Sequence, residues 1–216
     1  MTLADWTTRP RPDGTPIEGR YARLEKLDAK RGDTLYEASL DPVRYRWLFD
    51  QPPADRAAFD RWREGAERGT DPLFYAVIDR ATGRAEGRQA FLRMAPEHGV
   101  IEIGSILWGP RIARTRVATE ALWLFAQHAF TTLGYRRFEW KCDSENTPSR
   151  EAALRFGFTF EGIFKQHMVV KQKNRDTAWF AIVDGDWPRI GARMERWLDP
   201  ANFDAAGLQR RALIDI

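Results

Sequence analysis

One stretch of the chain, residues 100–158, most constrains its fold. Residues 100–108 are rich in β-branched and large apolar side chains and predict a strand. Residues 115–133 repeat apolar side chains at three- and four-residue spacing, which predicts a helix with one buried face, and Gly134 follows as a left-handed stop. Residues 135–142 alternate again and predict a second strand. A strand, a helix and a strand of these lengths imply a parallel pair with a right-handed crossover.

Three arginines gather in the turn before this helix: Arg111, Arg114 and Arg116. The start of a helix already carries the positive end of the dipole and unpaired backbone N–H groups, so cations there are unfavourable unless an anion is expected. A phosphate at this helix end would meet N–H donors, the dipole and guanidinium groups together. The alternative is an arginine-rich surface loop whose side chains extend into water.

A second, shorter helix is predicted over residues 148–156. Thr147 is a good N-cap, Pro148 suits the first turn, and Gly157 ends the helix before an apolar strand that starts at Phe158. Two helix N-termini therefore follow the carboxyl ends of two neighbouring parallel strands. Open α/β sheets bind ligands at such places.

Six short motifs occur in order over residues 100–186: Glu102-Ile103-Gly104, Arg111-x-x-Arg114-x-Arg116, Ala118-Thr119-Glu120-Ala121, Asn146-x-x-Ser149, Gly157-Phe158 and Glu161-Gly162. Together they resemble the catalytic core of the GNAT N-acetyltransferase superfamily, in its branch of ribosomal-protein N-terminal acetyltransferases. Arg111 fits the first position of the family's pyrophosphate turn, whereas Arg114 and Arg116 stand where glycines are usual. The resemblance implies an α/β (α+β) fold with a central mixed sheet. Its first half would be antiparallel, a splayed parallel pair would lie in the middle, and helices would cover both faces.

The remaining sequence is consistent with one domain of this kind. Residues 1–20 are predicted to be an extended lead-in, residues 21–188 a single acetyltransferase domain, and residues 189–216 a C-terminal helical extension. Local patterns place further helices at residues 28–40, 55–65 and 188–198, and further strands at residues 21–27, 73–78, 86–93, 160–171 and 177–183.

The resemblance implies acetyl-CoA as the cosubstrate. Its pantetheine arm would bond to the backbone near residues 106–108, and its pyrophosphate would lie on the N–H groups of residues 114–119. The residues expected to contact it are Ile106, Leu107, Trp108, Arg111, Arg114, Thr115, Arg116, Val117, Ala118, Thr119, Asn146 and Ser149. No metal is expected, because the three His and the single Cys lack metal-ligand spacing.

Two residues are candidates for the proton transfers. Ser149 matches a serine that this branch is proposed to use to protonate the departing thiolate, and the alternative is local helix capping. The family's usual tyrosine acid is replaced by Ala153. Glu102 is the candidate base, because catalytic carboxylates occur on this strand elsewhere in the superfamily, and the alternative is a structural glutamate paired with an arginine. Asn146 would bond the cofactor arm, or cap the second helix.

Three further expectations concern the surroundings of the cleft. Glu120 is expected to brace the phosphate turn, and Cys142 to be a small buried hydrophobe rather than a nucleophile. Four aromatic residues would wall a pocket for the acceptor: Trp47, Phe49, Trp62 and Trp108.

The predicted function is transfer of an acetyl group from acetyl-CoA to a primary amine by direct attack in a ternary complex. The acceptor would be a protein N-terminus or a small-molecule amine. A formal net charge of +3, interspersed charges, one Cys and no long apolar run favour a cytoplasmic protein without nucleic-acid or membrane partners, and a homodimer is possible. Two alternatives stay open. One is a catalytically idle acyl-CoA-binding sensor or interaction protein, and the other is an arginine turn that binds RNA phosphates.

Overall fold

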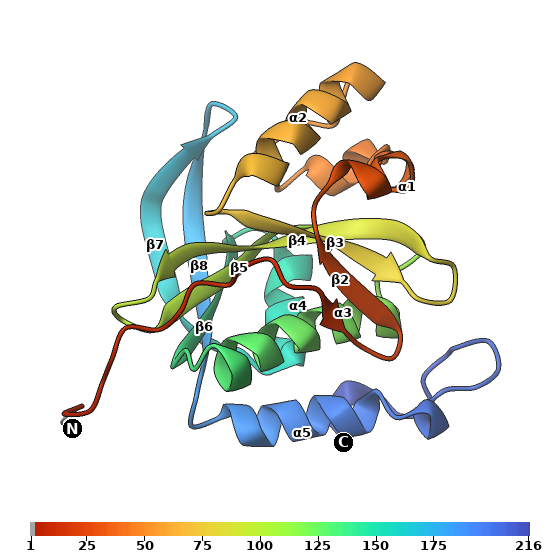
Figure 1. Ribbon diagram of the computed structural model, residues 1–216. Coiled ribbons are helices and arrows are strands. Elements are labelled where there is room, and N and C mark those ends of the chain that lie inside the picture. Colours follow the sequence, from red (N-terminus) through yellow and green to blue (C-terminus); the bar gives the residue numbers. More distant parts are fainter. Residues whose placement is uncertain (1–2) are drawn as a thin grey trace.

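The computed structural model describes residues 3–216, so the first two residues of the predicted lead-in lie outside it. One eight-stranded sheet, ordered β1-β2-β3-β4-β5-β6-β8-β7, forms the centre of the molecule (Figure 1). Its strands are β1 (Ile17–Glu18), β2 (Ala22–Lys26), β3 (Leu73–Asp79), β4 (Arg84–Ala95), β5 (Val100–Trp108), β6 (Arg137–Asp143), β7 (Thr159–Val170) and β8 (Lys173–Val183). Only β5 and β6 pair in parallel, and the other neighbours are antiparallel. The predicted mixed sheet, antiparallel at first with a parallel pair in its middle, is confirmed.

Helices cover both faces of this sheet, as expected. In Figure 1, α1 and α2 lie above the sheet, and α3 and α5 lie below it. The helices are α1 (Gly32–Ala38), α2 (Arg56–Arg68), α3 (Arg116–Gln127), α4 (Thr147–Phe156) and α5 (Trp187–Trp197). A π-helical turn, His128–Thr132, extends α3 and accounts for the rest of the helix predicted over residues 115–133.

Strand β3 explains why the sheet needs helices on both sides. Leu73, Tyr75 and Val77 belong to the large core that α3, α4 and α5 complete. The alternate residues Phe74 and Ala76 belong to a second core formed with α1 and α2. Successive side chains of a strand point to opposite faces, so an almost wholly apolar strand is buried on both.

A β-bulge in β5 separates it from β6. Two residues of β5, Ser105 and Ile106, lie opposite the single residue Gln89 of β4, and Ser105 has φ of 50°. A bulge bends its strand and increases the local twist. The β5–β6 pairing accordingly ends at Ile103 and Trp140, although both strands continue. This parting of two parallel strands positions the candidate site.

The ends of α4 and of the β7–β8 hairpin refine the sequence expectations. Asn146, not Thr147, is the N-cap of α4, because its side-chain oxygen accepts the Ser149 N–H at 3.2 Å. Gly134 and Gly157 have φ of 71° and 98°, which confirms the predicted left-handed stop and helix end. Strand β8 begins earlier than expected, since its pairing with β7 continues to Val170↔Lys173. The turn between the two strands is therefore limited to Lys171 and Gln172.

The segment after α5 returns to the body of the molecule. It contains two 3₁₀ turns, Pro200–Asn202 and Leu213–Asp215. Leu213 is buried in the large core, whereas Leu208 and Ile214 are exposed. None of the helices in the described part of the chain is long and apolar enough to cross a membrane.

Candidate active site

A cleft of about 280 Å³ opens where β5 and β6 part. One wall is the end of β5, the opposite wall is the end of β6, and α4 adds Asn146, Ser149 and Ala152. The loop between α1 and α2 adds Arg44 and residues 47–49, and β4 and β8 add further side chains. Residues far apart in the sequence thus surround one space at the carboxyl ends of two parallel strands, where ligands bind in open α/β sheets.

The β5 wall offers backbone groups. Beyond Ile103 the edge of β5 that faces β6 has no partner strand, and Ile106 and Trp108 line the cleft along it. Leu107 is buried and pairs with Arg88 of β4 on the other side. An extended molecule entering the cleft can therefore hydrogen-bond along β5 as an added strand would.

The turn into α3 presents N–H groups. Thr115 caps the helix: its hydroxyl accepts the Val117 N–H at 3.2 Å and donates to the Ile112 carbonyl at 2.7 Å. The Thr119 N–H is bound to the Thr115 carbonyl. Three other N–H groups of this turn have no acceptor among residues 3–216: those of Arg114, Arg116 and Ala118. A helix start with free N–H groups suits an anion.

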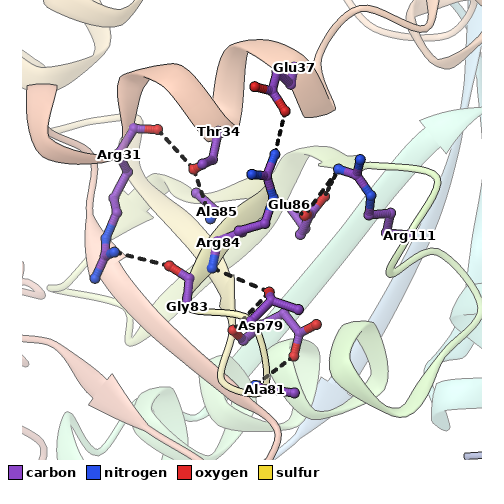
Figure 2. Close-up of polar contacts among 11 residues, drawn as sticks. Arg31, Thr34, Glu37, Asp79, Ala81, Gly83, Arg84, Ala85, Glu86 and Arg111 are labelled. Carbon is purple, nitrogen blue, oxygen red and sulfur yellow. Dashed lines mark hydrogen bonds and ion pairs between the residues drawn. The ribbon is translucent and has the colours of Figure 1, made fainter.

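The three arginine side chains of this turn have different surroundings. Figure 2 shows Arg111 reaching Glu86, with 3.2 and 3.3 Å between its Nη1 and the two carboxylate oxygens. Arg84 also binds Glu86, which is buried. The Arg116 guanidinium lies over the rings of Tyr21 and Phe203, 4.4 and 5.1 Å from their centroids. Arg114 is exposed and, within residues 3–216, has neither an ion pair nor an aromatic partner.

Glu120 does not brace this turn, so that expectation is wrong. Its carboxylate accepts the backbone N–H groups of Arg20, Tyr21 and Ala22 at 2.9, 2.5 and 2.6 Å. It therefore fixes the entry into β2. These partners precede Glu120 by about a hundred positions, and no local pattern indicates them.

Arg155 of α4 approaches the same helix start and was not anticipated. Its Nη1 lies 3.4 Å from the Thr119 hydroxyl, and no carboxylate of residues 3–216 pairs with it. Burial, together with the nearby charge of Arg193, lowers the pKa of Arg155. A half-buried guanidinium beside unpaired N–H groups adds to the positive field at this helix end.

Ser149 Oγ accepts a hydrogen bond from β6 and lies beside the Cys142 thiol. The Trp140 indole N–H donates to Ser149 Oγ at 3.0 Å, and helix capping is performed by Asn146 instead. Since Oγ accepts one hydrogen bond from Trp140, the serine can donate its own hydrogen, either to the Cys142 thiol or to a ligand in the cleft. Cys142 also lines the cleft, and burial raises the pKa of its thiol. A raised pKa disfavours the thiolate that a nucleophile requires.

Glu102 lies in the cleft wall, but its carboxylate is ion-paired with two cations. Arg93 Nη1 is 3.0 Å from both oxygens, and Lys141 Nζ is 2.9 Å from one of them. Lys141 also binds Glu139 at 2.7 Å. Only 3% of the Glu102 side chain is exposed. These contacts match the alternative considered from the sequence, a structural glutamate paired with an arginine.

The aromatic wall is formed by three of the four expected residues. Trp47, Phe49 and Trp108 line the cleft. Trp62 does not, because it packs in the second core against Phe59 and Phe74, at 5.7 and 5.6 Å between ring centroids. Assigning Trp62 to this pocket was wrong.

Four cations of the cleft were missed by the sequence analysis: Arg44, Arg93, Lys141 and Arg175. For Lys141 the sequence held one indication of its position, since alternation along β6 places it on the same face of the sheet as Glu139. Arg175 carried none, because it precedes the predicted strand at residues 177–183. The described residues contain no group of three or more His, Cys, Asp or Glu that could hold a metal ion.

Residues 23–159 match the family described as "Acetyltransferase (GNAT) domain". A crystal structure of a GCN5-related N-acetyltransferase from Brucella melitensis is 56% identical, with a TM-score of 0.96 over 98% of both chains. The uncharacterized N-acetyltransferase p20 of Bacillus licheniformis is 27% identical over 76% of this chain and 93% of its own length.

A more distant solved structure shares the fold. It is an acetyl transferase from Salmonella typhimurium that modifies the N-terminal serine of the 50S ribosomal subunit protein L7/L12. Its identity is 19% and its TM-score 0.67, over 78% of this chain and 98% of that one.

Proposed function

Because the chain belongs to the acetyltransferase (GNAT) domain family, whose members are acyl-CoA-dependent acetyltransferases, we propose that it acetylates a primary amine in the cleft between β5 and β6. The acetyl donor is acetyl-CoA, and the amine attacks it directly in a ternary complex. The observation that carries this proposal is the pair Trp140 and Ser149, which presents a hydroxyl hydrogen inside the cleft.

Donor binding is supported by two features of the cleft. The free edge of β5 near Ile106 and Trp108 suits the amide-containing pantetheine arm, and Asn146 keeps its amide nitrogen available for the same arm. The unpaired N–H groups of the turn into α3 suit the pyrophosphate, with Arg114 and Arg155 adding positive charge. Val117, Ala118 and Thr119 shape this helix start, and Arg116 contributes its backbone while its side chain lies on Tyr21.

The amine nitrogen bonds to the thioester carbonyl carbon, the carbon–sulfur bond breaks, and the departing thiolate takes the Ser149 hydroxyl hydrogen. As the amide forms, the nitrogen loses its surplus proton to water, and the serine regains a proton from water. The attacking ammonium must first lose one, and the contacts of Glu102 with Arg93 and Lys141 favour water over Glu102 as acceptor. Glu102 then serves to hold two cations in the cleft wall.

The acceptor remains either a protein N-terminus or a small amine. We place the reaction in the cytoplasm, with which a single buried, unpaired cysteine is consistent. The distant relative that acetylates a ribosomal protein makes N-terminal serine peptides a sensible first acceptor class.

The test is an acceptor screen with saturating acetyl-CoA, monitored by free-thiol release and by mass spectrometry of the product. We expect amine-dependent thiol release that requires both substrates together. A sensor would bind CoA and release no thiol with any amine. A nucleic-acid module would bind RNA in a salt-sensitive way that CoA does not displace. Either result would replace this proposal.

A further inference from the structure

One buried cation in the cleft has neither a hydrogen-bond acceptor nor a counterion among residues 3–216. Arg175 of β8 is 7% exposed and lines the cleft, and its guanidinium lies 4.9 Å from the centroid of the Phe49 ring. Within residues 3–216 it donates no hydrogen bond and forms no ion pair, and its Nε is buried without an acceptor. The Phe49 ring attracts a cation but accepts no in-plane N–H, so Nε is left without an acceptor while the Nη groups have only solvent to bind.

An unpaired buried guanidinium is unfavourable unless a ligand completes it. Burial lowers the pKa of Arg175, which records this loss of hydration. Asp143 and Glu102 act on it only at longer range than an ion pair. Glu102 is already held by Arg93 and Lys141, so it cannot serve as the counterion.

The cleft as a whole carries a net positive charge, like Arg175 itself. Its lining includes four cationic side chains and one carboxylate. Arg44 approaches Asp41 outside the cleft at 3.3 Å, and Arg93 and Lys141 share Glu102. Of these four cations, Arg175 is the one that forms no ion pair with a carboxylate of residues 3–216. A cleft of this kind attracts an anion and holds it at the unsatisfied guanidinium.

We propose that the acceptor amine carries an anionic group, a carboxylate or a phosphate, and that Arg175 binds it. This inference rests on the proposed acetyl transfer and names the class of acceptor. Ser149 and Arg175 line the same cleft, so one molecule can place its amine at the reacting end and its anion on β8. The planar fork of a guanidinium matches both carboxylate and phosphate oxygens.

The test uses matched acceptor pairs that differ only in the anion. These are glycine and glycinamide, 2-aminoethyl phosphate and 2-aminoethanol, and two peptides that begin Ser-Glu and Ser-Gln. For at least one pair we expect the anionic member to have roughly tenfold or higher kcat/KM, as a charge-assisted contact supplies. Arg175→Gln should remove that difference, and Arg175→Lys should retain part of it. Arg150→Gln is the control, since Arg150 is outside the lining and donates to the Ser144 carbonyl.

A second measurement covers acceptors outside this panel. Phosphate and succinate are titrated by calorimetry into protein saturated with CoA, which blocks the turn before α3. Wild-type and Arg150→Gln protein should bind one of these anions, and Arg175→Gln should not. Arg175→Gln should also melt at the same or a higher temperature, because it removes an unpaired buried charge.

The outcomes separate the two proposals. Equal kcat/KM within every pair, or anion binding unchanged in Arg175→Gln, would overturn the anionic acceptor while acetyl transfer stands. Failure to bind acetyl-CoA, or no thiol release with any amine, would count against the proposed function. In the latter case the calorimetric comparison still decides whether Arg175 holds an anion.

Discussion

The indole N–H of Trp140 donates to Ser149 Oγ at 3.0 Å across the end of the cleft. The two residues come from different elements, β6 and α4, and the bond leaves the serine with a hydrogen to donate. Trp140 is also packed between Phe156 and Phe158, so its position is determined by the core. The position of the proposed proton donor is thus set by packing.

Replacing Ser149 by alanine should lower kcat while leaving the affinity for acetyl-CoA unchanged. Loss of a positioned proton donor lowers kcat by roughly tenfold to hundredfold, given that water can substitute. Trp140→Phe keeps an aromatic ring but removes the donor to Oγ, so a smaller fall is expected. Steady-state kinetics with a binding titration tests both variants. Wild-type kcat in Ser149→Ala would remove the serine from the mechanism.

Arg114 allows charge and backbone conformation to be separated. Its φ is 65°, a region that glycine adopts freely and alanine does not. Arg114→Gly should therefore be more stable than Arg114→Ala by roughly 1 kcal/mol. Both should weaken acetyl-CoA binding by roughly fivefold at low salt, because an exposed charge contributes little and is screened.

Arg61→Ala is the matched control for this experiment, because it removes one exposed charge from α2 on the opposite face of the sheet. Thermal unfolding and calorimetric titration at two salt concentrations provide the measurements. Equal acetyl-CoA affinity in wild type and both Arg114 variants would exclude this side chain from phosphate binding.

Glu102→Gln should destabilise the protein. It leaves the cations Arg93 and Lys141 near each other with one carboxylate fewer, and breaking such a buried pair costs roughly 3 kcal/mol. Adding Lys141→Met should recover much of that loss. Urea unfolding measures both effects. If Glu102→Gln instead abolished turnover at unchanged stability, Glu102 would be the general base after all.

Cys142 should react slowly with alkylating reagents near neutral pH. Burial raises the pKa of its thiol above the ordinary value of 9.0, so the thiolate fraction grows only when pH rises beyond that value. Iodoacetamide labelling followed by mass spectrometry across pH 7–10 tests this, with urea-unfolded protein as the fast reference. Cys142→Ala should retain turnover. Rapid labelling at pH 7 would contradict the raised pKa of the thiol, and an acetyl group trapped on Cys142 would contradict a direct-attack reaction.

Much of the fold was accessible from local patterns. The alternation of β5 and β6, the apolar spacing of α3 and the left-handed glycines Gly134 and Gly157 all operate over a few residues. They predicted the strand–helix–strand unit and, to within one residue, the start of α4. The motif order then led to the GNAT resemblance, which the match over residues 23–159 supports.

The details of the cleft were not accessible in this way. The bulge at Ser105 depends on pairing with Gln89, and the role of Glu120 depends on backbone that precedes it by about a hundred positions. No local pattern distinguishes Trp62 from Trp108, yet Trp62 packs in the second core and Trp108 lines the cleft.

The sequence by itself determined which segments become strands and helices, because backbone propensity and apolar spacing are properties of neighbouring residues. Only the tertiary structure decided which charges are neutralised. Glu102 meets Arg93 and Lys141, and Arg175 meets no carboxylate within residues 3–216, because ion pairs and burial depend on which distant segments come within a few ångströms.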